Sequence, residues 1–145
     1  MKYIIRKAQT ADAKAISNLS LQLGHETKVE DSLTRMEIIL KLDDNVLYVA
    51  DFEGQVGGWI QATYCHRLEA GSFVEITGLV VDEGWRGKGV GKALIEEVVT
   101  WTKFIGCSSL RVRSNVIRKE AHLFYENLGY TLTKEQKVFD KKIID

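Results

Sequence analysis

The feature that most constrains this chain is a stretch in which a strand pattern, a glycine-rich turn and a helix pattern follow one another without interruption. Residues 73–81 read FVEITGLVV, a β-branched and apolar run typical of a strand. Glycines then stand at positions 84, 87, 89 and 91. From Val90 to Ile105 apolar residues recur every three or four positions, which predicts a helix. Because such a turn aims successive backbone amides at one place, and the helix N-terminus adds partial positive charge, we expect an anion site that fits a diphosphate.

The spacing of these glycines excludes two common phosphate loops. The Walker loop GxxxxGK[ST] fails because Val90 follows the candidate match at residues 84–89. The dinucleotide fingerprint GxGxxG fails because the third glycine, Gly91, comes one position too early. Residues 86–91, RGKGVG, fit the pattern R/Q-x-x-G-x-G/A instead. The alternative is a glycine-rich turn that binds nothing.

Composition limits the size and partners of the protein. A chain of 145 residues that is 45% hydrophobic can bury one core, so we expect a single domain spanning 1–145. Acidic and basic residues number 20 each, which argues against a nucleic-acid partner. The N-terminus lacks the apolar core of a secretory signal, and no apolar stretch reaches the ~20 residues that cross a bilayer. We therefore expect a cytoplasmic protein without a membrane partner.

Metal-ligand spacing is missing from the sequence. Cys65 and Cys107 form no CxxC pair, and the three histidines form no HxH or HExxH pattern. We expect no metal site.

Hydrophobic periodicity divides the whole chain into alternating elements. Strands are predicted at 3–7, 46–52, 55–64, 73–81 and 110–113, with a final strand pair at 130–143 that turns at Lys134-Glu135. Helices are predicted at 10–23, 29–42, 90–105 and 119–128. The order βααβββαβαββ indicates an α/β (α+β) domain with a mixed sheet and about four helices.

A second motif lies downstream of the glycine-rich turn. Residues 121–130, AHLFYENLGY, fit the block A-x-x-F-Y-x-x-x-G-F/Y. With the loop at 86–91, this block resembles the GNAT superfamily of acetyl-CoA-dependent N-acetyltransferases, over residues 74–130 directly and over the whole chain by element order. The resemblance implies a GNAT fold with a mostly antiparallel sheet. It also implies a V-shaped splay between the fourth and fifth strands, at a bulge that Gly78 could supply.

The resemblance implies acetyl-CoA as co-substrate, with its pyrophosphate on the backbone amides of residues 87–91 and pantetheine along the fourth strand. The implied cofactor-binding residues are Leu79, Val80, Val81, Arg86, Gly87, Lys88, Gly89, Val90, Gly91, Lys92, Asn115 and Tyr125. Two alternatives stay open: Lys88 and Lys92 as merely solvated side chains, and Asn115 as the cap of the following helix.

The resemblance also implies direct attack of an unprotonated amine on the thioester, with no covalent enzyme intermediate. Tyr125 matches the tyrosine that protonates the departing CoA thiolate, and its alternative is a core aromatic beside Phe124. Glu75 lies where histone-acetylating members carry a catalytic glutamate, and a partly buried carboxylate suits a base. Because strands alternate their faces, Glu75 could instead point to solvent.

The acceptor is the least determined part of the prediction. The segments FVEITGLVV and RSNVIRKEAHLFY also resemble aminoalkylphosphonate N-acetyltransferases, which suggests a small primary amine carrying an anionic group. Gly78 departs from that pattern, which has a second glutamate there. Aminoglycoside and peptide acetylation use the same scaffold. Protein or peptide amines, a non-catalytic acyl-CoA sensor and an interaction domain remain alternatives, and homodimers are common in the superfamily.

Overall fold

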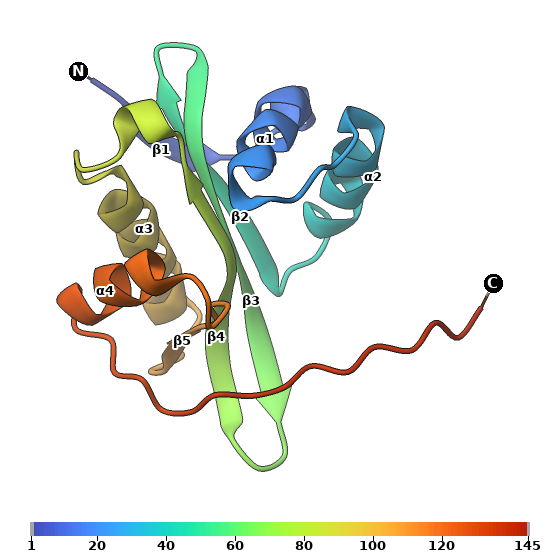
Figure 1. The fold of residues 1–145 in the computed structure, drawn as a ribbon, viewed down its shortest axis with the longest axis vertical. Helices are drawn as coiled ribbons and strands as arrows, with labels where there is room; N and C mark the ends of the chain where they lie inside the picture. Colours follow the sequence, from blue (N-terminus) through green and yellow to red (C-terminus); the bar gives the residue numbers. More distant parts are fainter. Residues whose placement is uncertain (1, 145) are drawn as a thin grey trace. The chain divides into compact units, whose positions relative to one another are not determined.

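The computed structural model describes residues 2–144. The chain divides into two compact units, Met1–Arg113 and Ser114–Asp145. The first unit holds the whole sheet and three of the helices, and the second holds one helix and the C-terminal segment (Figure 1).

The first unit is built on one five-stranded sheet in the order β1-β2-β3-β4-β5. Its strands are β1 (Ile4–Lys7), β2 (Asn45–Phe52), β3 (Gln55–Arg67), β4 (Gly71–Val81) and β5 (Leu110–Val112). The strands β1 to β4 pair antiparallel, whereas β5 runs parallel to β4. The expected hairpin between β2 and β3 turns at Glu53 (φ 54°) and Gly54 (φ 98°), because Gly54 needs no Cβ in the left-handed region.

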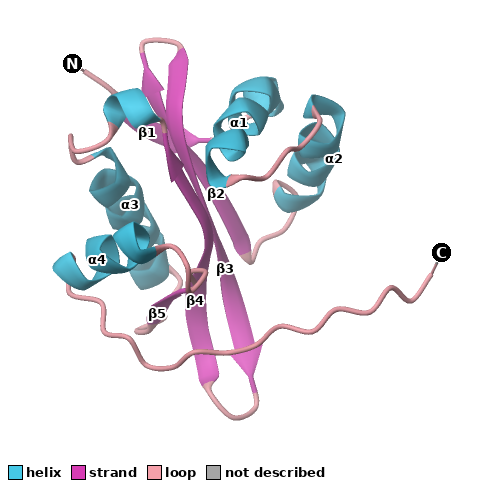
Figure 2. Ribbon diagram, viewed as in Figure 1, coloured by secondary structure: helices cyan, strands magenta, loops and turns pink. Residues whose placement is uncertain are grey.

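Two helices cover one face of this sheet and a third covers the other (Figure 2). The first pair is α1 (Ala13–Ser20), flanked by the 3₁₀ turns η1 (Thr10–Asp12) and η2 (Leu21–Leu23), and α2 (Val29–Ile39). The other helix is α3 (Val90–Phe104), which follows the short turn η3 (Glu83–Trp85). The helix predicted at 10–23 is therefore shorter than expected, with 3₁₀ geometry at both ends.

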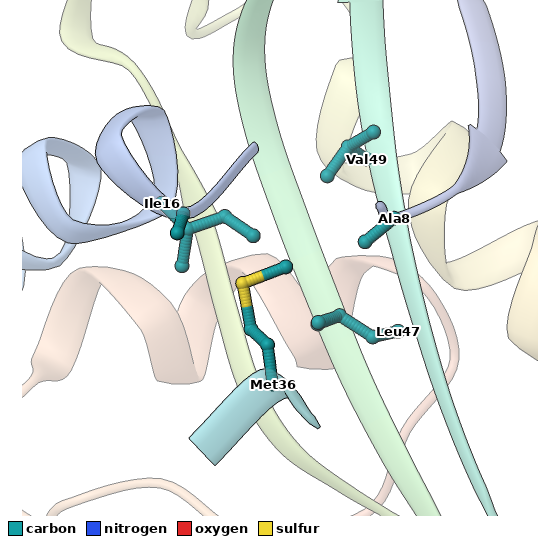
Figure 3. Close-up of a cluster of buried hydrophobic side chains, with 6 residues drawn as sticks. Ala8, Ile16, Met36, Leu47 and Val49 are labelled. Carbon is teal, nitrogen blue, oxygen red and sulfur yellow. The ribbon is translucent and has the colours of Figure 1, made fainter. Parts of the chain in front are cut away.

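The core on the α1 and α2 side joins both helices to the sheet. Six buried residues form this core (Figure 3): Ala8, Ala13, Ile16, Met36, Leu47 and Val49. The partly buried Trp59 packs against them. The opposite face buries Ile60 and Ile76 of the sheet and Leu94 and Val98 of α3, none more than 2% exposed. Burial on both faces holds the central strands rigidly between two layers.

The second unit contains α4 (Lys119–Asn127), which ends at Gly129 with φ 92°. Residues 130–144 form neither helix nor strand, so the strand pair predicted at 130–143 is wrong. Two physical reasons explain why no strand pair forms here. Lys134-Glu135 offers no residue that favours the positive φ of a tight hairpin turn, and an isolated two-stranded hairpin has only marginal stability in water.

Candidate functional site

The glycine turn, residues 86–91, connects η3 to α3 in the first unit. Gly87 and Gly89 have φ of 76° and 82°, and Gly89 is the N-cap residue of α3. Nothing lies within 4 Å of a Cβ built at either position, so the backbone angle, not crowding, favours glycine there. The first helical amides, from Val90 onward, have no intrahelical acceptor and lie at the positive end of the helix dipole. This turn can bind an anion.

Aromatic packing anchors the turn to the sheet. Trp85 stacks on Phe52 of β2 with ring centroids 3.8 Å apart. A Cβ at Gly57 would approach both rings to 2.8 Å, so the close packing there requires glycine. The Lys88 ammonium lies 5.5 Å from the Trp85 ring centroid and stays exposed. Lys92, in the first turn of α3, is exposed as well.

Arg86 ties the turn to neighbouring elements. Its Nε donates to the Val81 carbonyl at 3.0 Å, and its guanidinium also reaches the Gln22 side-chain oxygen at 3.4 Å. The same Gln22 oxygen accepts a hydrogen bond from the backbone amide of Glu83 at 3.0 Å. Arg86 thus holds the end of β4 in place, a role that the sequence did not indicate. Gln22 was missed altogether, because no local pattern links η2 to a turn about sixty residues later.

A bulge and a splay lie in β4, as expected. Ile76 pairs with Ala62 and Gly78 with Gln61, so Thr77 is an extra residue opposite this pair on β3. The parallel pairing with β5 covers only Val74, Glu75 and Ile76 of β4 and stops at the bulge.

Beyond the bulge, β4 has a free edge. Within residues 2–113, the stretch Gly78–Val81 pairs with β3 alone. Leu79 and Val81 are half-buried, and Val80 is 2% exposed. A Cβ at Gly78 would lie 2.7 Å from the Trp59 ring, so a second glutamate would not fit here. The edge can accept an extended ligand and leads directly into the glycine turn.

Glu75 of β4 pairs with Thr63 of β3, so the two side chains point to the same face of the sheet. Thr63 shares this face with Trp59, which packs against the core under α1 and α2. Glu75 therefore points to the face that α1 and α2 cover. It is 7% exposed, so the alternative in which it points to solvent is wrong. Its carboxylate accepts from the Arg113 guanidinium at 3.3 Å. A buried carboxylate is a candidate contact for a cationic ligand.

Other polar side chains share this side of the sheet. We call Asn45, Trp59, Gln61, Thr63 and Glu75 the polar face. Gln61 and Thr63 both donate to the Asn45 oxygen, at 3.2 and 2.8 Å. The Trp59 indole N–H is buried and has no acceptor among the described residues. The sequence analysis missed Trp59, Gln61 and Thr63, although strand alternation alone places them on one face of β3.

Two arginines flank the polar face. Phe73 precedes Glu75 by two residues on β4 and therefore lies on the same side. Arg111 of β5 and Arg67 of β3 lie over its ring, with guanidinium carbons 4.0 and 5.8 Å from the centroid. Positive charge thus stands beside the buried carboxylate.

The second unit holds the remaining two expected site residues. Burial raises the pKa of the Tyr125 phenol, so it stays protonated throughout the neutral range. Its ring packs edge-on against Phe124 at 5.3 Å and Tyr130 at 6.1 Å. The side-chain oxygen of Asn115 accepts a hydrogen bond from the Ile117 amide at 3.1 Å. The N-cap residue of α4 is Arg118. Asn115 therefore closes a turn before the helix and does not cap it.

Among residues 2–144, no three His, Cys, Asp or Glu side chains cluster where they could hold a metal ion. Over the same residues, no helix is long and apolar enough to span a membrane.

Comparison with known proteins matches these features to a family. The model of the Acetyltransferase (GNAT) family matches residues 8–130, which include the glycine turn and Tyr125. The aminoglycoside N(6')-acetyltransferase type 1 of Stenotrophomonas maltophilia is 29% identical over 93% of this chain and 90% of its own. The N-acetylaspartate synthetase of Xenopus tropicalis is 32% identical over 63% of this chain and 32% of its own.

Solved structures share the fold over nearly the whole chain. Aminoglycoside N-acetyltransferase AAC(6')-Iy in complex with CoA superimposes with a TM-score of 0.86 at 23% identity, covering 99% of this chain and 96% of the other. Glucosamine-6-phosphate N-acetyltransferase from Arabidopsis thaliana gives 0.80 at 28% identity, covering 97% and 100%. The fold expected from the two motifs is confirmed.

Proposed function

The chain belongs to the Acetyltransferase (GNAT) family and is an acetyl-CoA-dependent N-acetyltransferase, and we propose that it acetylates a primary amine of a small molecule by direct attack in a ternary complex. The two units act together as one domain spanning 1–145. The family match supports this, because it crosses from one unit into the other. The location is cytoplasmic.

The observation that carries the proposal is the continuity of β4 with the glycine turn. The free edge at Gly78–Val81 offers main-chain groups to the amide-rich pantetheine arm. Six residues after Val81, the amides of 87–91 begin, and they offer an anion site for the pyrophosphate. One uninterrupted segment therefore binds both parts of CoA, and Asn115 adds a polar contact to pantetheine.

Glu75 is the base in this reaction. Its buried carboxylate takes the ammonium proton, directly or through a water, and the freed amine attacks the thioester carbonyl. Tyr125 is the acid that protonates the departing CoA thiolate. Burial raises the pKa of this phenol, so the proton is still on Tyr125 at neutral pH when the thiolate forms. The ammonium loses two protons in all, one to Glu75 before the attack and one from the tetrahedral intermediate. One of the two restores the phenol of Tyr125 after it has protonated sulfur, and the other leaves for solvent.

The polar face receives the acceptor. Gln61 and the Trp59 indole supply hydrogen-bonding groups beside Glu75, which attracts a cationic amine. Arg67 and Arg111, on the same side of the sheet, suit an anionic group at the other end of the acceptor. A small amine that carries an anion, such as an aminoalkylphosphonate, is the first candidate class. Aminoglycosides are the second, on the strength of the similar Stenotrophomonas maltophilia enzyme.

The test is release of free CoA thiol from acetyl-CoA with a panel of aminoalkylphosphonates, amino acids, aminoglycosides, polyamines and peptides. Acetyl-CoA binding is followed by calorimetry in parallel. Turnover with one small-molecule class supports the proposal and names the acceptor. Turnover with peptides alone contradicts the small-molecule acceptor, and binding of acetyl-CoA without any turnover favours a sensor.

A further inference from the structure

The backbone amides between β4 and α3 fall into two groups. The four amides of residues 83–86 all donate hydrogen bonds, two of them to the side chains of Gln22 and Asp82 and two to backbone carbonyls. The amides of residues 87–92 have no acceptor among the residues that the structure describes. Along α3 the first bonded amide is that of Ala93, which donates to the Gly89 carbonyl at 3.0 Å. The amides that are free to bind an anion therefore follow directly after a fully bonded segment.

Gln22 differs from the other acceptors of this bonded segment in its distance along the chain. The remaining three bonds span two or three residues, so they shape the turn η3 but do not place it in the fold. The Gln22 side-chain oxygen lies on η2, 61 positions before the Glu83 amide that it accepts. The stack of Trp85 on Phe52 keeps η3 close to the sheet. A hydrogen bond is directional, so the Gln22 contact sets the orientation of η3.

The second contact of Gln22 reaches the free edge of β4 through Arg86. Val81 pairs with β3 without exchanging hydrogen bonds, because the amide of the next residue donates to the Gly57 carbonyl at 2.9 Å. The Val81 carbonyl therefore points to the free edge, where the Arg86 Nε donates to it at 3.0 Å. The same guanidinium donates to the Gln22 oxygen at 3.4 Å. One oxygen thus joins η3 and the end of β4.

We infer that Gln22 is a positioning residue for the pyrophosphate of acetyl-CoA. By holding the Glu83 amide and the Arg86 guanidinium, it keeps the free amides of residues 87–92 in the orientation that binds the anion. A site whose donors are already oriented loses less free energy on binding than one that must first be ordered. The inference rests on the proposed function, because it requires the pyrophosphate to lie at the glycine turn.

Three variants of the full chain test this role. Gln22→Met removes the accepting oxygen at similar side-chain length, whereas Gln22→Glu keeps an accepting oxygen. Gln55→Met is the matched control, because Gln55 is exposed and lines the same cavity of about 350 Å³ as Gln22. The Gln55 side chain has no hydrogen bond to any described residue. All three variants should keep the circular dichroism and the melting temperature of the wild type.

The affinity for acetyl-CoA, measured by calorimetry, should fall about 2–12-fold in Gln22→Met, the range that one hydrogen bond contributes. Gln22→Glu should recover most of this loss, and Gln55→Met should match the wild type. In turnover, kcat/KM for acetyl-CoA should fall by the same factor with kcat unchanged.

Acetyl-pantetheine separates positioning of the turn from a general structural role. This thioester lacks the pyrophosphate, so its kcat/KM should be the same in Gln22→Met and the wild type. A disturbed sheet would instead weaken both acyl donors, because both use the free edge of β4. A matched fall in kcat/KM for the two donors therefore overturns the inference.

Two further results would contradict the role of Gln22 and leave the proposed function intact. One is wild-type affinity for acetyl-CoA in Gln22→Met, and the other is a loss that Gln22→Glu does not reduce. Gly89→Val, measured in parallel, identifies failure of the proposed function itself. If it also binds acetyl-CoA like the wild type, or if the wild type does not bind acetyl-CoA, the pyrophosphate does not lie at the glycine turn and both proposals fail.

Discussion

The glycine turn and the polar face lie in the same unit but are built in opposite ways. The turn uses the backbone of one continuous segment, and its chemistry lies in amide groups whose direction is set by the glycine conformation at positions 87 and 89. The polar face uses side chains brought together by register from β2, β3 and β4. A backbone site is sensitive to conformation and tolerant of side-chain identity, whereas a side-chain site is the reverse.

The largest effect should come from the polar face, at the proposed base. We expect Glu75→Gln to lower kcat by roughly 10²–10⁴-fold, the range that one general base contributes, and to leave calorimetric acetyl-CoA binding unchanged. Glu83→Gln, on the exposed turn η3, is the control and should keep kcat unchanged. An unaltered kcat in Glu75→Gln would remove the carboxylate from the mechanism.

Tyr125→Phe should lower kcat by about 10²-fold, since a phenyl ring keeps the packing but loses the acidic proton. The decisive measurement is the acyl donor. A thioester whose thiol is a better leaving group needs no protonation, so it should restore most of the lost rate. Equal losses with both donors would mean that Tyr125 only packs against Phe124 and Tyr130.

Gly89→Val should weaken acetyl-CoA binding about 5–150-fold. A β-branched residue at φ 82° costs roughly 1–3 kcal/mol, and relief of that strain would move the helix amides. Gly84→Ala is the matched control, because a Cβ there meets only an ordinary contact at 3.7 Å. Lys88→Ala should change the affinity less than about fivefold, as expected for an exposed charge. If Lys88→Ala were the more damaging change, the turn would not be a backbone site.

The smallest effect should be selective for the acceptor. Gln61→Ala removes one neutral hydrogen-bonding group from the polar face, which is worth about 0.5–1.5 kcal/mol. We expect KM for the amine to rise roughly 2–12-fold, with KM for acetyl-CoA unchanged. A matched rise in both constants would show that the sheet itself had been disturbed.

The contrast between the glycine turn and the polar face also explains which parts of the structure could be predicted from the sequence. The helices, the five strands and the glycine turn follow from local patterns: apolar periodicity, the hairpin at Glu53-Gly54 and the spacing of glycines. The bulge near Gly78 was expected from the resemblance to the GNAT superfamily and not from a local pattern. The strand pair at 130–143 failed, because strand-forming composition does not supply the partner that a strand requires.

The sequence by itself determined the segment that turns from β4 into α3, because glycine conformation and helix periodicity act over a few neighbouring residues. Only the tertiary structure decided that Glu75 is buried beside Arg113 and that Gln61 and Thr63 share an acceptor in Asn45. Those contacts join residues 16 to 38 positions apart. They depend on strand register, which packing of the whole sheet against α1, α2 and α3 fixes.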